Sequence, residues 1–178
     1  MGAPVVIGLD LSTTTGWCAG PVGGIPKWGA WRLAEASAER GARWGGLSNQ
    51  LSALIVASSP ALVVKEAPLR FAAQSSELVR RNQYGLHAAT EEACWRLGIE
   101  PREVGADAVR MALMGRCRWP KGADGASVDP KKMVLAWCRD HGFDVRQPDA
   151  ADALMVWLYA CQHFAALCGR PEGDARTA

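Results

Sequence analysis

The chain contains 178 residues, a length that predicts one compact domain with little room for a second. Hydrophobic residues make up 49% of the sequence and charged residues 21%, a composition that excludes an intrinsically disordered protein. The 20 Lys and Arg residues are nearly balanced by 18 Asp and Glu residues. A globally basic nucleic-acid-binding protein is therefore excluded, and binding to phosphates requires local clusters of basic residues.

The cysteines and the apolar segments bear on the cellular compartment. The six cysteines form no Cys-x-x-Cys pair, and the sequence does not begin with the basic and apolar regions of a secretory signal. We therefore expect reduced thiols, no zinc site and a cytoplasmic protein. The apolar segment 153–168 is shorter than a membrane span and contains Gln162 and His163. It predicts a buried helix, and no contact with a membrane is expected.

The first part of the sequence predicts three strands. These predicted strands cover 5–10, 17–19 and 27–33. Because successive strand residues point to opposite faces, Val6, Gly8 and Asp10 are expected on one face of the first strand. Turn residues and a Gly- and Pro-rich loop separate the three segments, so they predict an antiparallel meander.

Beyond residue 40, predicted helices alternate with short predicted strands. The predicted helices cover 44–55, 76–97, 106–114, 130–139 and a last segment that begins after Pro148. The predicted strands cover 61–66, 102–104 and 143–145. This alternation is typical of an α/β fold with helices packed on a mixed sheet. The polar residues 169–178 predict a flexible C-terminal tail, which leaves 1–168 as the single domain.

Four carboxylates stand where a buried charge is expected. Asp10 and Glu66 end two apolar strands, and Asp149 and Asp152 share one face of the first turn of the last helix. Buried carboxylates are unfavourable when unpaired, and carboxylates that converge also repel one another. Mg²⁺ prefers oxygen ligands and relieves both effects. We expect two Mg²⁺ ions ~3.5–4 Å apart, for which Mn²⁺ substitutes, to activate water for hydrolysis of a phosphodiester.

Each carboxylate also has a purely structural interpretation. Asp10 is able to cap the turn that follows it, and Glu66 is able to pair with Lys65 or Arg70. Asp149 and Asp152 suit the start of a helix, where backbone N–H groups are unpaired. Acids at two strand ends and one helix start, in a chain of modest charge, together favour the metal site.

Three motifs resemble the RuvC family of Holliday junction resolvases. Segments 7–16 (IGLDLSTTTG) and 63–66 (VVKE) resemble the family's first-strand and fourth-strand motifs, and 149–154 (DAADAL) matches its C-terminal motif residue for residue. Order and spacing agree over roughly 4–165. The resemblance implies a ribonuclease H-like fold with a mixed five-stranded sheet flanked by helices. It also implies Mg²⁺-dependent cleavage of four-way DNA junctions by a homodimer, with helix 76–97 as the candidate interface.

The resemblance also implies roles for individual residues. The implied metal ligands and catalytic residues are Asp10, Glu66, Asp149 and Asp152, with Lys131 as a further catalytic residue. Arg110 stands where the family has a lysine, a change that keeps the charge but alters the donor geometry. The family's aromatic residue after the fourth strand is replaced by Leu69, so base stacking would fall to Phe71. The loop 115–127 is longer than in the family, and these departures favour a phage or prophage version.

Basic residues gather between positions 110 and 132, where six of them are opposed by two acidic residues. A second group lies near the start of the helix 76–97. The predicted DNA-binding residues are Arg70, Phe71, Arg80, Arg81, Arg110, Arg116, Arg118, Trp119, Lys121 and Lys132. Such clusters suit a phosphate backbone, and Trp119 is placed to stack on an unpaired base. A solvated loop without a ligand is the alternative interpretation.

These features predict a Mg²⁺-dependent, structure-selective DNA endonuclease that resolves four-way junctions by paired phosphodiester hydrolysis. Its expected substrate is four-way or branched DNA, and a branch-migration helicase partner stays unassigned. A junction has approximate two-fold symmetry, so paired cuts need two sites related by a two-fold axis, which an isologous homodimer supplies.

Three other functions fit parts of the sequence. Another ribonuclease H-like nuclease, acting on flaps, other branched DNA or RNA–DNA hybrids, would use the same acids. A non-catalytic DNA-binding module would gain nothing from grouped carboxylates beside phosphates. An actin-like ATPase also has a phosphate-contacting hairpin like 8–14, but it needs two lobes and a second Gly-rich acidic hairpin, which this sequence lacks.

Overall fold

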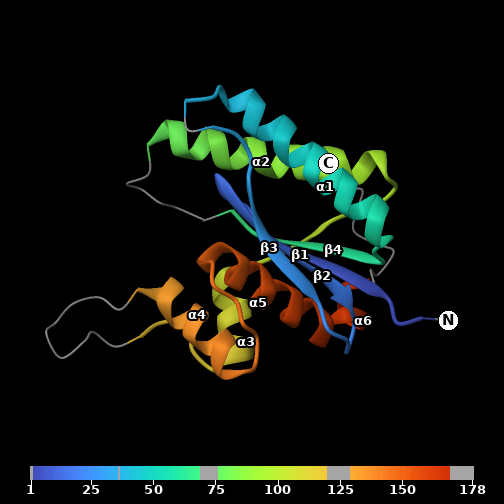
Figure 1. Cartoon of the computed structure of the whole chain (residues 1–178), viewed down its shortest axis with the longest axis vertical. Coiled ribbons are helices and arrows are strands. Elements are labelled where there is room, and N and C mark those ends of the chain that lie inside the picture. Colours follow the sequence, from blue (N-terminus) through green and yellow to red (C-terminus); the bar gives the residue numbers. More distant parts are fainter. Residues whose placement is uncertain (1, 36, 69–75, 120–128, 169–178) are drawn as a thin grey trace, which may run out of the picture.

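The computed structural model describes residues 2–35, 37–68, 76–119 and 129–168. It contains a five-stranded sheet with the order β3–β2–β1–β4–β5 (Figure 1). The strands are β1 (Val5–Asp10), β2 (Thr14–Pro21), β3 (Lys27–Arg32), β4 (Leu62–Glu66) and β5 (Arg102–Val104). The first three strands pair antiparallel as a meander, whereas β4 pairs parallel with β1 and β5 pairs parallel with β4. The predicted mixed five-stranded sheet is confirmed.

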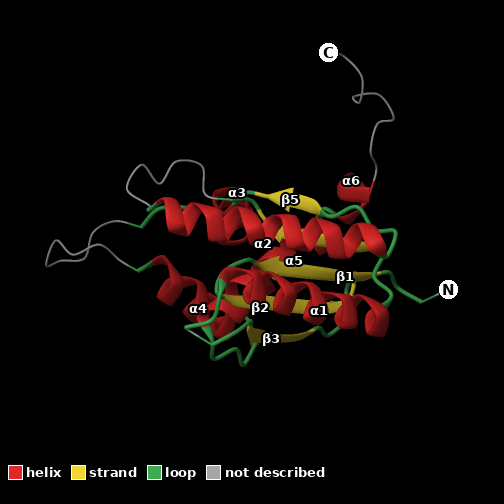
Figure 2. Ribbon diagram, turned by 90° about the horizontal axis from the view of Figure 1, so that it is seen from above, coloured by secondary structure: helices red, strands yellow, loops and turns green. Residues whose placement is uncertain are grey.

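Helices cover both faces of this sheet. They are α1 (Arg40–Ser58), α2 (Glu77–Arg96), α3 (Ala106–Met114), α4 (Pro130–Asp140), α5 (Pro148–Gln162) and the short α6 (Phe164–Cys168). The pair α1 and α2 lies on one face, and α5 with α3 and α4 lies on the other (Figures 1 and 2). This arrangement is typical of an α/β fold in which both faces of the central sheet are buried.

The alternation along β1 divides the core into two layers. Val6 packs with residues of α5, whereas Ile7 and Leu9 pack with residues of α1 and α2. All three side chains are fully buried, and burial of an aliphatic side chain contributes roughly 1.5–3 kcal/mol. The predicted face of β1 is confirmed, so Asp10 ends the strand on the side that faces α5.

Two glycines allow α5 to lie directly against the sheet. A Cβ atom at Gly8 would lie 2.6 Å from the backbone nitrogen of Trp157, and one at Gly16 would overlap the carbonyl oxygen of Asp149. The helix is further held where Nε1 of Trp157 donates to the carbonyl oxygen of Gly20 at 3.2 Å. Close approach therefore sets the position of the helix that carries Asp149 and Asp152.

A capped turn places the lysine of the predicted site. The Asp129 side chain accepts a hydrogen bond of 3.0 Å from the backbone N–H of Lys131, and Pro130 fills the first position of α4. An Asp cap followed by Pro is a common helix start, because both reduce the number of unpaired N–H groups. The start of α4 is thereby fixed one residue before Lys131.

Two details of the prediction are wrong. Residues 143–145 form no strand; the backbone N–H of Val145 donates to the carbonyl oxygen of Phe143 at 2.7 Å, which turns the chain locally. The buried Val145 side chain accounts for the apolar pattern that suggested a strand. The expected buried helix over 153–168 is divided at His163 into the end of α5 and α6, and α6 has no buried residue.

In the part of the chain that the structure describes, no helix has both the length and the apolar character needed to cross a bilayer.

Gly8→Ala tests the close approach of α5 to the sheet. The added methyl group would meet backbone atoms that cannot rotate away, so we expect a loss of about 1–3 kcal/mol in the free energy of unfolding. The matched control is Gly45→Ala in α1, where a Cβ atom meets nothing within 4 Å. This control should gain about 0.5–1 kcal/mol, since alanine favours a helix over glycine. Urea unfolding measures both variants, and equal effects would contradict the packing argument.

Candidate active site

A cleft with a volume of ≈ 570 Å³ opens where β1 and β4 end. Three carboxylates line it, and they come from Asp10 of β1, Glu66 of β4 and Asp152 of α5. Because Leu9 pairs with Lys65 in the parallel register, the two strand-end acids lie side by side at the same edge of the sheet. The cleft therefore brings together acids that are far apart in the sequence.

These carboxylates lie in an unfavourable electrostatic environment. Burial raises the pKa of Asp10 well above its usual range, and the negative charges of Glu66 and Asp152 raise it further. The pKa of Glu66 is raised to about 7, first by burial and then by the charge of Asp152. Burial also raises the pKa of Asp152, although Lys131 and Arg110 oppose the shift. Burial and neighbouring negative charges thus disfavour the ionised forms of these acids, which predicts an affinity of the cleft for cations.

Lys131 of α4 supplies part of the missing positive charge. Its Nζ donates a hydrogen bond of 2.6 Å to Oδ1 of Asp149 and lies 3.8 Å from Oδ2 of Asp152. Burial lowers the pKa of Lys131, but the hydrogen bond to Asp149 and the nearby acids outweigh burial and raise it. The ammonium stays charged and links Asp149, the fourth predicted acid, to the carboxylates of the cleft.

The donor atoms of the cleft suit a hard divalent cation. Oδ2 of Asp10 is buried and has no hydrogen-bond partner in the described part of the chain. An orphaned carboxylate oxygen is costly, and Mg²⁺ is a natural partner for it. The described His, Cys, Asp and Glu side chains nevertheless form no ready-made metal-ligand cluster. The site is a set of oxygen donors around a cleft and not a preformed coordination cage.

The predicted DNA-binding residues occupy different places. Arg110 lines the cleft. Five predicted basic residues are exposed and do not line the cleft. Arg80 and Arg81 lie on α2, Arg116 and Arg118 follow α3, and Lys132 lies at the start of α4. Trp119 is half-buried after α3. The remaining three predicted DNA-binding residues, Arg70, Phe71 and Lys121, lie outside the described residues.

Comparison with known proteins identifies the fold. No protein-family model and no curated protein matches the sequence. Two structures of Thermus thermophilus RuvC are similar to the chain, one of them in complex with a Holliday junction substrate. They share 19% and 17% sequence identity with it at TM-scores of 0.66 and 0.68. They cover 92% and 91% of this chain, which in turn covers 97% and 96% of theirs.

The chain has the RuvC fold. A more distant structure, the yeast mitochondrial Holliday junction resolvase Ydc2, has a TM-score of 0.56 at 12% identity. That match covers 94% of this chain and 85% of the resolvase. The resemblance to RuvC that three sequence motifs indicated is therefore confirmed at the level of the fold.

One wall of the cleft in this RuvC fold was missed by the sequence analysis. Residues of α2 form it, and those that line the cleft are Leu78, Val79, Asn82, Gln83, Leu86 and His87. Arg43 of α1 completes this side. The spacing of 79, 82, 83 and 86 marks one face of a helix, but the same spacing is typical of a core-facing stripe. The polar amides within that stripe were the available signal.

Glu66→Gln tests the electrostatic strain of the cleft. The pKa of Glu66 is about 7 in the folded protein, against an ordinary value of 4.5, so folding favours its protonated form. This carboxyl group is not destabilising below pH 4.5. Its unfavourable contribution grows between about pH 4.5 and 7, where only the unfolded chain ionises it, and is fully present above pH 7. Without divalent metal, we expect the Gln variant to be about 1–3 kcal/mol more stable than the parent at pH 8.

Urea unfolding at pH 5 and pH 8 with a chelator measures this difference. The control is Glu35→Gln, which removes an exposed carboxylate paired with Arg32 and should change stability little at either pH. A Glu66→Gln variant that is less stable than the parent at pH 8 would show that the carboxylate is not strained.

Proposed function

We propose that this protein is a Mg²⁺-dependent DNA endonuclease that resolves four-way junctions by paired phosphodiester hydrolysis. The observation that carries the proposal is the cleft itself, where acids from β1, β4 and α5 face a lysine from α4. The fold adds support, because a structure with this fold holds a Holliday junction substrate. We also propose that the protein acts in the cytoplasm of a bacterial cell or a phage-infected host.

The four acids would hold the metal, and the cations would hold the substrate. Asp10, Glu66, Asp149 and Asp152 would bind two Mg²⁺ ions, for which Mn²⁺ substitutes. Such ions activate a water molecule and stabilise the leaving oxygen in phosphodiester hydrolysis. Lys131, whose ammonium already lies among the acids, would donate to the scissile phosphate.

Phosphate binding would extend beyond the cleft. Arg110 lines the cleft, and its charge already lowers the pKa of Glu66 against the effect of burial. The exposed arginines of α2 and those that follow α3 would contact phosphates farther along the arms of the junction. Trp119 would stack on an unpaired base. The roles predicted for Arg70, Phe71 and Lys121 remain part of this proposal.

We propose a homodimer with α2 in the interface. The helix exposes large apolar side chains, with Leu78 and Tyr84 both 62% exposed and Trp95 77% exposed. Exposed apolar side chains on one helix are typical of an interface. An isologous dimer would present two clefts related by a two-fold axis, as paired cuts in a symmetric junction require.

Asp10→Asn tests the nuclease assignment. The change removes a metal ligand but no basic residue, so cleavage should fall by at least about a thousandfold while junction binding stays within about twofold. The assay compares a synthetic four-way junction with a linear duplex and an RNA–DNA hybrid, all with Mg²⁺. The control, Asp144→Asn, removes an exposed carboxylate outside the cleft and should leave cleavage unchanged.

The outcomes separate the candidate functions. Paired cuts in the junction alone support resolution, and preferred cleavage of the hybrid would favour another nuclease. Retained cleavage by Asp10→Asn would remove this carboxylate from the site.

Lys131→Ala tests the role of the ammonium among the acids. If Lys131 contacts the scissile phosphate, the turnover rate should fall about 10–100-fold while junction affinity changes little. The neighbouring Lys132→Ala is a matched comparison, because Lys132 is exposed on the same turn of α4. Its loss should weaken binding and reduce the salt dependence of affinity. Equal effects of the two variants on turnover would contradict the assignment of Lys131.

A further inference from the structure

Lys65 is the residue before Glu66 in the sequence, but its side chain lies on the face of the sheet opposite to the Glu66 side chain. Lys65 precedes Glu66 in β4, and because strand residues alternate, its side chain points toward α2 and away from the acids. The side chain is only 1% exposed. A buried ammonium is unfavourable unless each of its N–H groups has an acceptor. The acceptors around Lys65 therefore define its role.

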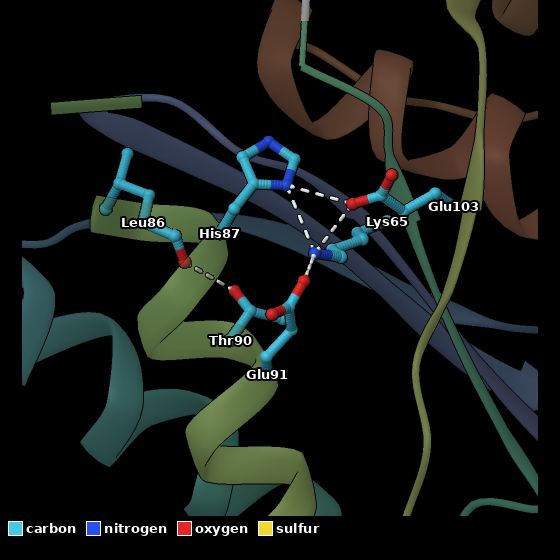
Figure 3. A network of polar contacts seen from close by, with 6 residues as sticks. All are labelled: Lys65, Leu86, His87, Thr90, Glu91 and Glu103. Atoms are coloured by element: carbon cyan, nitrogen blue, oxygen red, sulfur yellow. Dashed lines mark hydrogen bonds and ion pairs between the residues drawn. The ribbon is translucent and has the colours of Figure 1, made fainter. Parts of the chain in front are cut away.

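The three N–H groups of Lys65 match three acceptors (Figure 3). Nζ lies 2.7 Å from Oε1 of Glu91, 2.8 Å from Oε1 of Glu103 and 3.2 Å from Nδ1 of His87. Two of these partners are carried by α2 and one by β5, so the ammonium ties the helix to the sheet. An ammonium donates hydrogen bonds and accepts none, so in a hydrogen bond between Nζ and Nδ1 the His87 nitrogen is the acceptor.

This contact sets the tautomer of His87. A ring nitrogen that accepts a hydrogen bond has no proton, so the neutral imidazole has its proton on Nε2. Nδ1 also lies 3.5 Å from Oε1 of Glu103, a longer contact than the one with Lys65. Burial lowers the pKa of His87, and the charge of Lys65 lowers it further. Together they outweigh the charge of Glu103 and its hydrogen bond, which raise the pKa, so the neutral ring is favoured.

The protonated nitrogen of His87 faces away from the lysine. Figure 3 shows Nε2 on the side of the ring opposite to the Lys65 ammonium. His87 lines the cleft of the acids, and Nε2 is not one of the buried atoms left without a partner in the described chain. With Nδ1 occupied by Lys65, Nε2–H is the polar group through which this ring meets the cleft.

The charges of the cleft indicate what such a donor binds. Arg110 and Lys131 line the same cleft, so an anionic strand is the ligand that fits it. The donor is carried by α2, which forms a different wall of the cleft from the strand ends that carry Asp10 and Glu66. A neutral N–H group holds a phosphate oxygen without placing a further positive charge beside a metal site.

We propose that His87 is a substrate-binding residue whose Nε2–H donates to a backbone phosphate of the strand in the cleft. Lys65 is the positioning residue that holds the imidazole in this tautomer. The inference deepens the proposed nuclease function and rests on it. It differs from the roles of the acids and of Lys131, because it concerns a wall of the cleft formed by α2.

Two substitutions at His87 test the donor position. The amide nitrogen of Gln reaches about the place of Nε2, whereas that of Asn reaches only about the place of Nδ1. We expect His87→Asn to raise KM for the junction about tenfold with a smaller change in kcat, since it removes a hydrogen bond to a charged group. His87→Gln should restore KM to within about threefold of the parent. The control is His163→Asn, at the exposed end of α5 and outside the cleft.

The ring nitrogens report the tautomer directly. The chain has three histidines, so ¹⁵N-histidine labelling gives few signals, and those lost in His87→Gln belong to His87. We expect a protonated Nε2 and an unprotonated Nδ1 in the parent protein without metal or DNA. In Lys65→Met the proton should move toward Nδ1, where Glu103 is the remaining acceptor, and KM should rise as it does in His87→Asn.

The outcomes distinguish this inference from the proposed function. A parent protein that neither binds nor cuts branched DNA overturns the nuclease assignment and the phosphate contact together. If the parent cuts junctions but His87→Asn and His87→Gln have equal KM values, only the inference about His87 fails. A protonated Nδ1 in the parent would overturn the role of Lys65.

Discussion

The site depends on how closely α5 approaches the sheet. Gly8 and Gly16 leave no Cβ atom between the strands and the helix, so the backbone of α5 contacts β1 and β2 directly. Asp152 is thereby brought to the acids that end β1 and β4. Burial raises the pKa values of Asp10 and Glu66, and the charge of Asp152 raises both further. Packing at two glycines thus creates an electrostatic strain that a bound cation relieves.

The two lysines beside this cluster use their charge in different ways. Lys131 is about half exposed and shares its ammonium between two acids of the site, so its partners can change when a ligand enters. Lys65 is buried and its three donors are already matched, so it serves as a fixed link between α2 and the sheet. Because side chains alternate along β4, Lys65 and Glu66 point to opposite faces of the sheet, so Lys65 lies away from the acids that Lys131 contacts. Of the two partners that the structural interpretation offered for Glu66, Lys65 is therefore wrong, and Arg70 lies outside the described residues.

Local patterns in the sequence predicted the elements whose residues carry their own signals. The alternation in β1, the helix start at Asp129 and Pro130, and the acids of α5 follow from short-range rules, and the structure agrees with them. The strand expected at 143–145 failed because an apolar residue in a tight turn has the same local pattern as one in a strand. The α2 wall was missed for a different reason. A helical stripe does not reveal whether it faces a core or a cleft, and that distinction depends on tertiary contacts.

The similarity to RuvC structures at under 20% identity shows that very different sequences adopt this fold. In this chain, the strand ends and the helix that packs on β1 are positioned by backbone geometry. The side chains on α2 are not constrained in this way, because one side of the helix packs on α1 and the sheet while another lines the cleft. Under the proposed function, chemistry at the acids and selection of the substrate would be separable. The first would depend on the packing of α5, and the second on residues such as His87, which Lys65 contacts from the opposite face of the sheet.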